Sequence, residues 1–309
     1  MTTADAATGG TDTRRPWWRR VFGKHPIGYL FAGPYVLFWL ALFAWPLYLA
    51  VYMSFRDWFF AAPGAVVDRP FVGLANYTDV LSDPAVHRAA LNVAIFILIN
   101  VPLTVIVSLV LAAALNQVLP LRGFFRTAYY VPYVTASVAM IAVWLFLFSN
   151  GGMVNQVLGP LAPDPSWLVN RYWAMPMIAL FATWKQLGFY VLLYLAAMQG
   201  ISETLYEAAE VDGAGPLRKF WSVTVPGVRS ATALVVVLAT IVGANFFTEP
   251  YLLTGGGGPN GASVSPVLLM YRAGIEQGDA GWAAALGVML AVVVMALSAV
   301  NRFFLEDRE

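Results

Sequence analysis

The chain has 309 residues, of which 60% are hydrophobic and only 11% are charged, with a net charge of +1. A soluble domain carries about 25% charged residues, so this composition indicates a protein with several membrane spans. The small net charge gives no field for binding nucleic acid, and the absence of cysteine excludes disulfides, thiolate metal ligands and cysteine nucleophiles. His25 and His87 are too few for a metal site, which needs three or four convergent ligands.

The N-terminal region is predicted to be a disordered tail that leads to a membrane surface. Residues 1–15 are small and polar, a composition that cannot form a packed core. A basic, aromatic approach to the membrane then follows, formed by Trp17, Trp18, Arg19, Arg20 and Lys24. The first apolar run starts near residue 28 and is too long for the apolar region of a cleaved signal peptide.

Six apolar segments follow, each long enough to cross about 30 Å of hydrocarbon as a helix. No linker between them is long enough to separate two domains. The sequence therefore predicts an all-α, polytopic membrane protein with a tail over residues 1–27, one domain over 28–302 and a short tail over 303–309. The predicted spans are about 28–53, 89–115, 127–149, 174–198, 231–253 and 280–302.

The distribution of Lys and Arg predicts the orientation of these spans. Twelve basic residues lie on the side that carries both termini, and five lie on the opposite side. Because basic residues concentrate on the cytoplasmic side, both termini are expected in the cytoplasm. The polar loop between spans four and five, residues 200–229, is then cytoplasmic as well.

The sequence of this loop predicts two short helices joined by a sharp turn. Ser202 can cap a helix that starts at Glu203, and Gly213 suits the left-handed position that ends it. Pro216 suits the first turn of a second helix, which Pro226 is expected to end. The first helix should present a shallow face flanked by Glu207 and Glu210, which could meet basic side chains of a partner. That face comprises Leu205, Ala208, Ala209 and Asp212.

Two other interpretations of the loop remain open at this point. It could be an amphipathic segment lying on lipid headgroups, because basic and aromatic residues favour that interface. A DNA-binding helix-turn-helix is less favoured, because the acidic first helix would repel phosphate.

The spacing of the loop resembles the EAA loop of ABC importer permeases. The matching residues are Glu207, Ala208, Ala209, Gly213, Val223, Val225 and Pro226, with Val where the family usually has Ile and Leu. The resemblance extends over residues 28–302 and implies the MetI-like fold of type I ABC importers. The segments 71–77 and 251–257 are similar to those of sugar-type permeases, the maltose and glycerol-3-phosphate group.

The resemblance implies a non-catalytic subunit in the plasma membrane of a prokaryote. The chain has no G-x-x-x-x-G-K-[ST] phosphate loop, so ATP would be bound by partner subunits, and no cofactor is expected in this chain. The implied partners are a second homologous permease, two copies of a cytoplasmic ATPase and an extracytoplasmic sugar-binding protein. The residues implied in coupling to the ATPase are Glu207, Ala208, Ala209, Asp212, Gly213 and Pro226.

Polar and aromatic residues in three spans are candidates for a substrate pathway, because polar groups within a membrane usually face a cavity or another helix. They are Tyr133 and Ser137 in span three, Lys185, Gln186, Phe189 and Tyr190 in span four, and Asn245 in span five. Tyr133 and Ser137, four apart, would share one helix face.

Each of these candidates also has a structural interpretation. Ser137 could bond a carbonyl of its own helix, and Tyr133 and Tyr190 could be core aromatics. Lys185 could snorkel to the interface, while Glu249 is expected to be solvated near the outer surface. Asn92 and Asn100 are expected to form hydrogen bonds between helices.

The sequence therefore favours the permease of an ATP-driven sugar importer. An importer of glycerol-3-phosphate or a related polyol phosphate is the alternative that Lys185 would suit. An ion-coupled secondary transporter would need acidic or histidine side chains at mid-membrane, where this sequence places none.

Overall fold

The computed structural model describes residues 27–61, 64, 67–117 and 122–306, so most of the predicted N-terminal tail lies outside the described residues, as do residues 307–309. Within these ranges the chain is helical, with two isolated bridges, Arg56–Phe71 and Phe59–Asp279, in place of a sheet. The chain divides into two compact units, Met1–Ala50 and Val51–Glu309.

The described part of the first unit is an apolar helical segment. It comprises α2 (Ile27–Trp39), a π-helical turn (Leu40–Ala44) and the beginning of α3 (Trp45–Ser54). Its large side chains, among them Phe31, Leu37 and Phe43, are mostly exposed. An apolar helix with so much exposed surface is suited to lipid or to another subunit as its neighbour.

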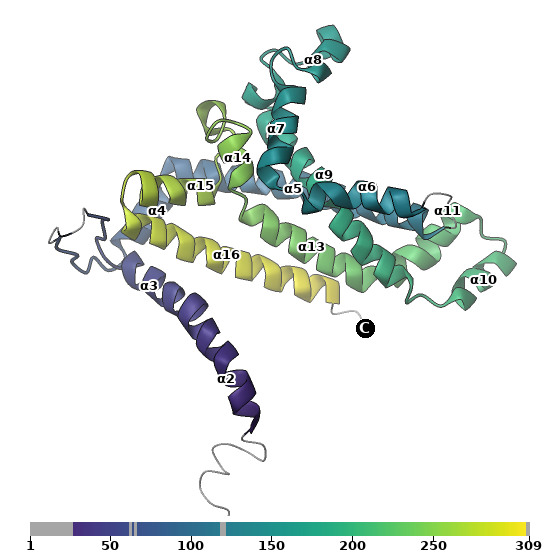
Figure 1. Cartoon of the computed structure of the whole chain (residues 1–309), viewed down its shortest axis with the longest axis horizontal. Coiled ribbons are helices and arrows are strands. Elements are labelled where there is room, and N and C mark those ends of the chain that lie inside the picture. Colours follow the sequence, from purple (N-terminus) through teal and green to yellow (C-terminus); the bar gives the residue numbers. More distant parts are fainter. Residues whose placement is uncertain (1–26, 62–63, 65–66, 118–121, 307–309) are drawn as a thin grey trace, which may run out of the picture. The chain divides into compact units, whose positions relative to one another are not determined.

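Four helices form the bundle of the second unit: α5 (Pro84–Asn116), α9 (Ala174–Met198), α13 (Arg229–Ala244) and α16 (Ala280–Glu306). α5 packs along α9, and α13 packs against both α5 and α16 (Figure 1). Helices α5, α9 and α16 coincide with the predicted second, fourth and sixth spans to within five residues. By length and composition, five helices of the described chain could cross a membrane. A sixth span is possible if the bent pair Pro216–Gly227 and Arg229–Ala244 crosses it together.

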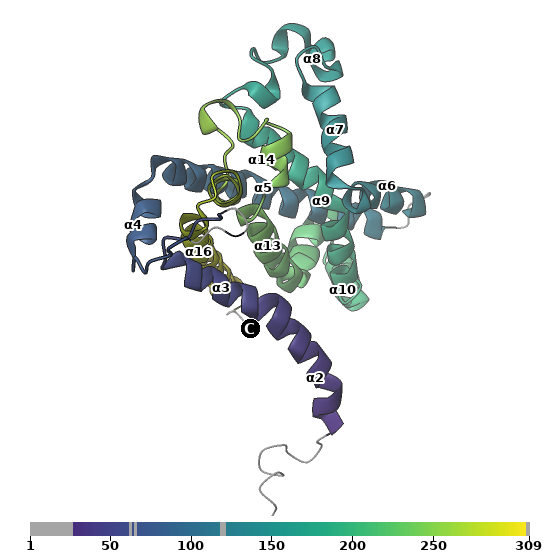
Figure 2. The same cartoon turned by 60° about the vertical axis from the view of Figure 1, so that its left-hand side comes forward.

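The third and fifth predicted spans are not continuous helices. The third divides into α6 (Arg122–Val134) and α7 (Ser137–Phe148), and α7 leaves the direction of α6 steeply (Figures 1 and 2). Pro132 has no amide hydrogen to donate within the last turn of α6, which weakens the helix there. Just beyond this helix, the Thr135 hydroxyl donates to the Val131 carbonyl at 2.7 Å.

The fifth span ends early, because α13 stops at Ala244 and a separate α14 (Thr248–Leu252) follows. A continuous helix through Pro250 would leave the Phe246 carbonyl without its amide partner and crowd it against the proline ring. The Asn245 side chain instead bonds the Ile241 carbonyl at 2.8 Å, at the end of α13. Helix α14 contacts α7, so the two breaks lie in neighbouring parts of the fold.

The loops between spans one and two, three and four, and five and six contain short helices. The loop helices are α4 (Ala75–Ser82), α8 (Met153–Leu158) and α15 (Pro266–Tyr271), with 3-10 turns at Gly159–Leu161, Trp167–Val169 and Pro259–Gly261 and a π-helical turn at Arg272–Glu276. Asn92 does not join two helices as expected, because its amide donates to the loop carbonyls of Gly261 and Val264.

Asn100 joins α5 to α9 as the sequence predicted. Its buried amide donates to the Thr183 hydroxyl at 2.8 Å. Interhelical hydrogen bonds in membranes contribute about 0.6 kcal/mol on average and up to about 1.7. We expect Asn100→Ala to lower the stability of the α5–α9 pair by about 1 kcal/mol, measured by denaturation in mixed detergent micelles. Asn116→Ala, at the exposed end of α5, is the matched control and should change stability little.

Candidate functional site

The first helix of the loop, α10 (Glu203–Val211), begins where the sequence predicted. Ser202 occupies the cap position, but its hydroxyl pairs with the Thr204 hydroxyl at 2.8 Å rather than with a backbone amide. The cap position was therefore predicted correctly and its hydrogen bond was not.

Gly213 ends the helix in the left-handed conformation, with φ of 74°. The Ala214 amide reaches back to the Ala209 carbonyl at 2.8 Å, and the Asp212 amide donates to the Ala208 carbonyl at 3.0 Å. This bonding pattern closes the helix and reverses the chain, and a side chain at Gly213 would strain it.

The second helical segment comprises α11 (Pro216–Lys219), a π-helical turn (Phe220–Thr224) and α12 (Val225–Gly227), and it meets α13 at an angle of 69°. Pro226 was predicted to end this segment, and it ends one residue later, at Gly227. Pro226 itself lies in the first turn of α12, where the missing amide of a proline is tolerated.

Two side-chain contacts fix the two loop segments to each other. Lys219 pairs with Glu210 at 2.8 Å, and the Tyr206 hydroxyl lies 3.0 Å from the Thr224 hydroxyl. The hydrogen bond from Lys219 lowers the pKa of Glu210, so the pair persists at neutral pH and is lost as the pH falls through that lowered pKa. Glu210 therefore contacts its own loop, although the sequence suggested that it faces a partner.

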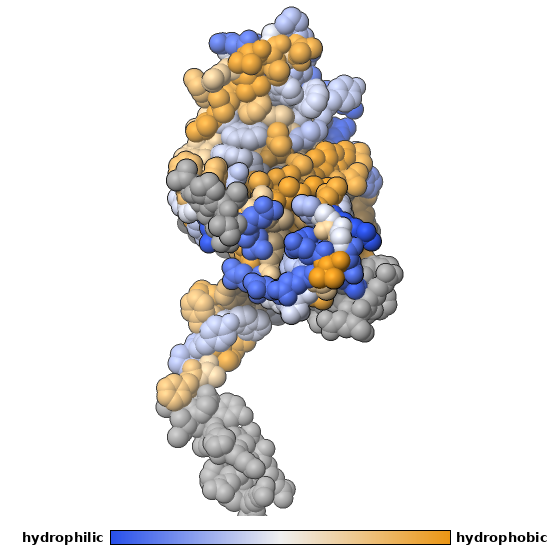
Figure 3. Space-filling view, turned by 90° about the vertical axis from the view of Figure 1, so that its right-hand side faces the viewer, coloured by the Kyte–Doolittle hydropathy of each residue, from blue (hydrophilic) through white to orange (hydrophobic). Residues whose placement is uncertain are grey.

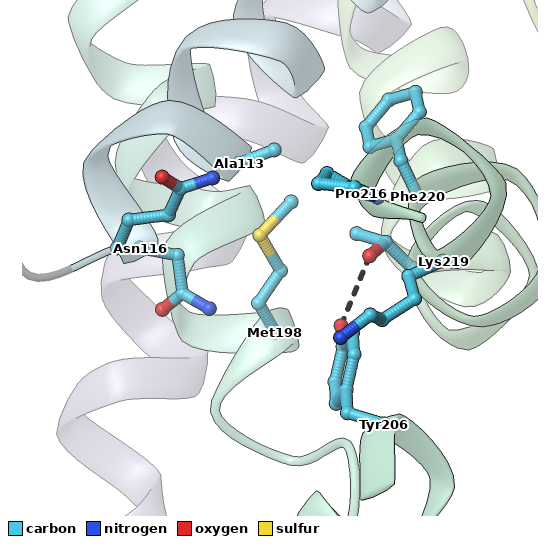
Figure 4. Close-up of a pocket in the computed structure, with 9 residues that line it drawn as sticks. Ala113, Asn116, Met198, Tyr206, Pro216, Lys219 and Phe220 are labelled. Atoms are coloured by element: carbon cyan, nitrogen blue, oxygen red, sulfur yellow. Dashed lines mark hydrogen bonds between the residues drawn. The ribbon is translucent and has the colours of Figure 1, made fainter. Parts of the chain in front are cut away.

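A cavity of about 330 Å³ lies behind the loop, between it and the ends of α5 and α9 (Figure 4). Its walls include Asn116 and Met198 from the bundle and Tyr206, Lys219 and Phe220 from the loop. The loop thus contacts the bundle around an open space.

The face of the molecule that carries the loop has a broad hydrophilic region (Figure 3). Glu207, Ala208 and Asp212 are exposed, and Ala209 is half-buried. Sequence reasoning overlooked two exposed apolar side chains on this surface, Val211 and Leu217, which are 89% and 73% exposed. Trp221, one of the aromatic residues behind the lipid-headgroup interpretation, is 63% exposed.

The structure brings most pathway candidates of α6 and α9 together. Tyr133 stacks on Phe189 with ring centroids 5.3 Å apart, and Phe189 meets Tyr190 edge-on at 5.3 Å. Tyr190 donates to Gln186 at 3.2 Å and is only 2% exposed, which places it in the core rather than on a lining surface. Ser137 does not share a helix face with Tyr133, because the chain breaks between α6 and α7.

Lys185 and Asn245 lie at the edge of this group. Lys185 is half-buried one turn before Phe189 on α9, and it forms no ion pair within the described part of the chain. Glu249, on α14, is half-buried rather than fully solvated. Asn245 is exposed at the break after α13. Broken helices of this kind frame substrate sites in transporters because their unwound backbone faces a cavity.

The described part of the chain thus consists of helices, with two interrupted spans and a two-helix loop between the fourth and fifth predicted spans. Residues 74–306 match the family described as binding-protein-dependent transport system inner membrane component. The chain belongs to this family. It is therefore an inner membrane component of an ABC importer, with the MetI-like fold.

Curated relatives match over nearly the whole chain. The arabinooligosaccharides transport system permease protein AraP of Bacillus subtilis (strain 168) is 30% identical over 92% of this chain and 90% of the relative. The sn-glycerol-3-phosphate transport system permease protein UgpA of Agrobacterium fabrum is 32% identical over 93% of this chain and 97% of the relative. The sulfoquinovosyl glycerol permease SmoG of the same organism is 29% identical over 92% of both chains.

A solved bacterial ABC transporter for the acidic polysaccharide alginate contains a chain of the same fold. The match has a TM-score of 0.80 and covers 95% of this chain and 99% of that chain, at 21% sequence identity. This similarity supports the fold, while the family match and the curated relatives support the permease class.

Proposed function

We propose that this chain is the permease of an importer for an oligosaccharide or a glycoside. The observation that carries the proposal is the family match, together with curated relatives whose names specify arabinooligosaccharides and sulfoquinovosyl glycerol. The stacked pair of Tyr133 and Phe189 supports it, because aromatic faces pack well against the apolar faces of sugar rings.

The proposed importer contains partners that supply what this chain lacks. A second homologous permease completes the pathway, and two copies of a cytoplasmic ATPase bind ATP, so this chain is non-catalytic and carries no cofactor. An extracytoplasmic binding protein delivers the solute, as in the solved alginate transporter bound to its periplasmic protein. Both termini lie in the cytoplasm, in accordance with the distribution of basic residues.

The cytoplasmic loop is the proposed docking element for the ATPase. Ala208 and Ala209 provide a shallow surface, Glu207 offers an exposed carboxylate, and Gly213 fixes the direction of the turn. Asp212 is exposed at the end of α10, and Pro226 lies where the loop approaches α13. The contact of this loop with the ATPase would carry the motion of ATP binding into the spans.

The proposed substrate pathway runs along the broken helices. Tyr133, Ser137, Lys185, Gln186, Phe189 and Asn245 are its candidate lining residues, and Tyr190 supports Phe189 from the core. An importer of a polyol phosphate is the second candidate function. Half-buried Lys185, without an ion pair within the described residues, and the similarity to UgpA favour it.

The solute carried by the cognate binding protein tests the proposed substrate class. We expect the purified binding protein to hold a neutral oligosaccharide or glycoside, identified by mass spectrometry of the released ligand. A bound polyol phosphate would favour the second candidate, and a bound amino acid or metal ion would contradict both.

Substitution of Lys185 distinguishes the two candidates within the permease itself. For a phosphorylated solute, Lys185→Gln should reduce uptake more than tenfold, because hydrogen bonds to charged groups contribute about 1.5–3 kcal/mol. For a neutral sugar, the same variant should retain most uptake. Lys185→Arg keeps the charge and should restore transport of the anionic solute, measured with labelled solute in reconstituted vesicles.

A further inference from the structure

The two segments of the cytoplasmic loop differ sharply in charge. Helix α10 carries only acidic charges, at Glu203, Glu207 and Glu210, with Asp212 following it. The segment 216–227 carries only basic charges, at Arg218 and Lys219. Because Glu210 and Lys219 pair with each other, the acidic charges left for a partner are on or next to α10, and the basic charge left for a partner is Arg218.

The segment 216–227 also carries large apolar side chains that face outward, beside a basic residue. Leu217, Arg218 and Trp221 are exposed, whereas Phe220 and Thr224 face the bundle and are half-buried or buried. The outward residues line an open, apolar recess of about 540 Å³ with Gly215 and Pro216. Exposed Trp beside Arg is typical of helices that lie at the membrane–water interface.

The direction of this segment places it along a membrane surface. It meets α13 at 69°, and α13 runs beside the spans α5 and α16. Because membrane helices are tilted by about 20° on average, a segment at this angle lies closer to the membrane plane than to its normal. It also ends directly before α13, so it lies at the depth where that helix begins.

We infer that the segment 216–227 is an interfacial anchor, whose Leu217, Arg218 and Trp221 bind an anionic lipid surface while α10 remains in water for the ATPase. The charges support this division. Anionic headgroups attract Arg218 and repel the acidic α10. The anchor would hold the start of α13 at a fixed depth, so that movement of α10 bends the loop instead of displacing the span. The inference rests on the membrane location of the chain and does not require that the ATPase docks on α10.

Site-directed spin labelling tests the anchor, because the chain contains no cysteine. Leu217→Cys, Trp221→Cys and the matched control Val211→Cys are labelled separately in the complex of the two permeases, first without the ATPase and then with a cysteine-free ATPase added. The complex is reconstituted in vesicles of phosphatidylethanolamine and phosphatidylglycerol. We expect labels at 217 and 221 to be more accessible to lipid-soluble oxygen than to a water-soluble nickel complex, and the label at 211 to show the reverse. A label that prevents assembly at 221 is replaced by one at Ser222, which is also exposed.

Two further measurements separate lipid from protein as the partner. Binding of the ATPase should immobilise the label at 211 and leave those at 217 and 221 unchanged. Arg218→Gln should reduce the accessibility preference at 217 roughly fivefold in anionic vesicles, because one basic residue near such a surface contributes about 1 kcal/mol. In phosphatidylcholine vesicles the same variant should have little effect. Aqueous accessibility at 217 and 221, or their immobilisation by the ATPase, would overturn the inference.

Discussion

Glu207→Ala is expected to abolish most ATP-driven uptake while leaving the spans folded. Glu207 is exposed on α10 and lies beside the shallow surface of Ala208 and Ala209. Removing one partner of a hydrogen-bonded charge pair in an interface costs about 2–5 kcal/mol, so affinity for the ATPase should fall more than tenfold. Co-purification with the ATPase and uptake in reconstituted vesicles measure the two effects.

Glu203→Ala removes the same charge one turn earlier on α10 and is the matched control. It should keep assembly and uptake near wild-type values. Equal losses in both variants would indicate a general effect of loop charge, and unchanged assembly and uptake in Glu207→Ala would contradict the docking assignment.

Gly188→Ala is expected to separate α6 from α9. A methyl group there would lie 2.7 Å from the Tyr130 Cα and closer still to the Tyr129 carbonyl oxygen. Backbone atoms cannot rotate away as a flexible side chain can, so the helices must move apart at a cost of about 1–3 kcal/mol or more. The movement would also break the stacking of Tyr133 on Phe189, so uptake should fall together with thermal stability.

Gly123→Ala is the control for this substitution, because a methyl group at Gly123 in α6 meets open space within the described structure. It should leave stability unchanged or raise it slightly, since Ala favours a helix more than Gly. The prediction fails if the melting temperatures of the two variants differ by less than the error of the measurement.

Sequence reasoning located the loop well because its turn chemistry is local. Gly213 permits a left-handed turn, and Pro216 favours the first turn of a helix. The structure has both features. The Lys219–Glu210 pair was overlooked, because it forms across the turn between residues nine positions apart. Opposite charges flanking a sharp turn were the available signal.

The spans were predicted less completely because hydropathy does not register a break within an apolar run. Pro132 and Pro250 marked the places where the third and fifth spans are interrupted, but membrane helices often continue through proline. The burial of Tyr190 could not be predicted either. It depends on how α5, α9 and α13 pack around it, and span four alone does not encode that packing.

Uptake by the complete, reconstituted importer tests the central claim most directly. Vesicles would contain this chain, the second permease and the ATPase, with the binding protein and labelled solute outside and ATP inside. The account predicts that uptake requires both ATP and the binding protein, and that Glu207→Ala abolishes it. Uptake that continues without ATP and follows a proton or sodium gradient would contradict it.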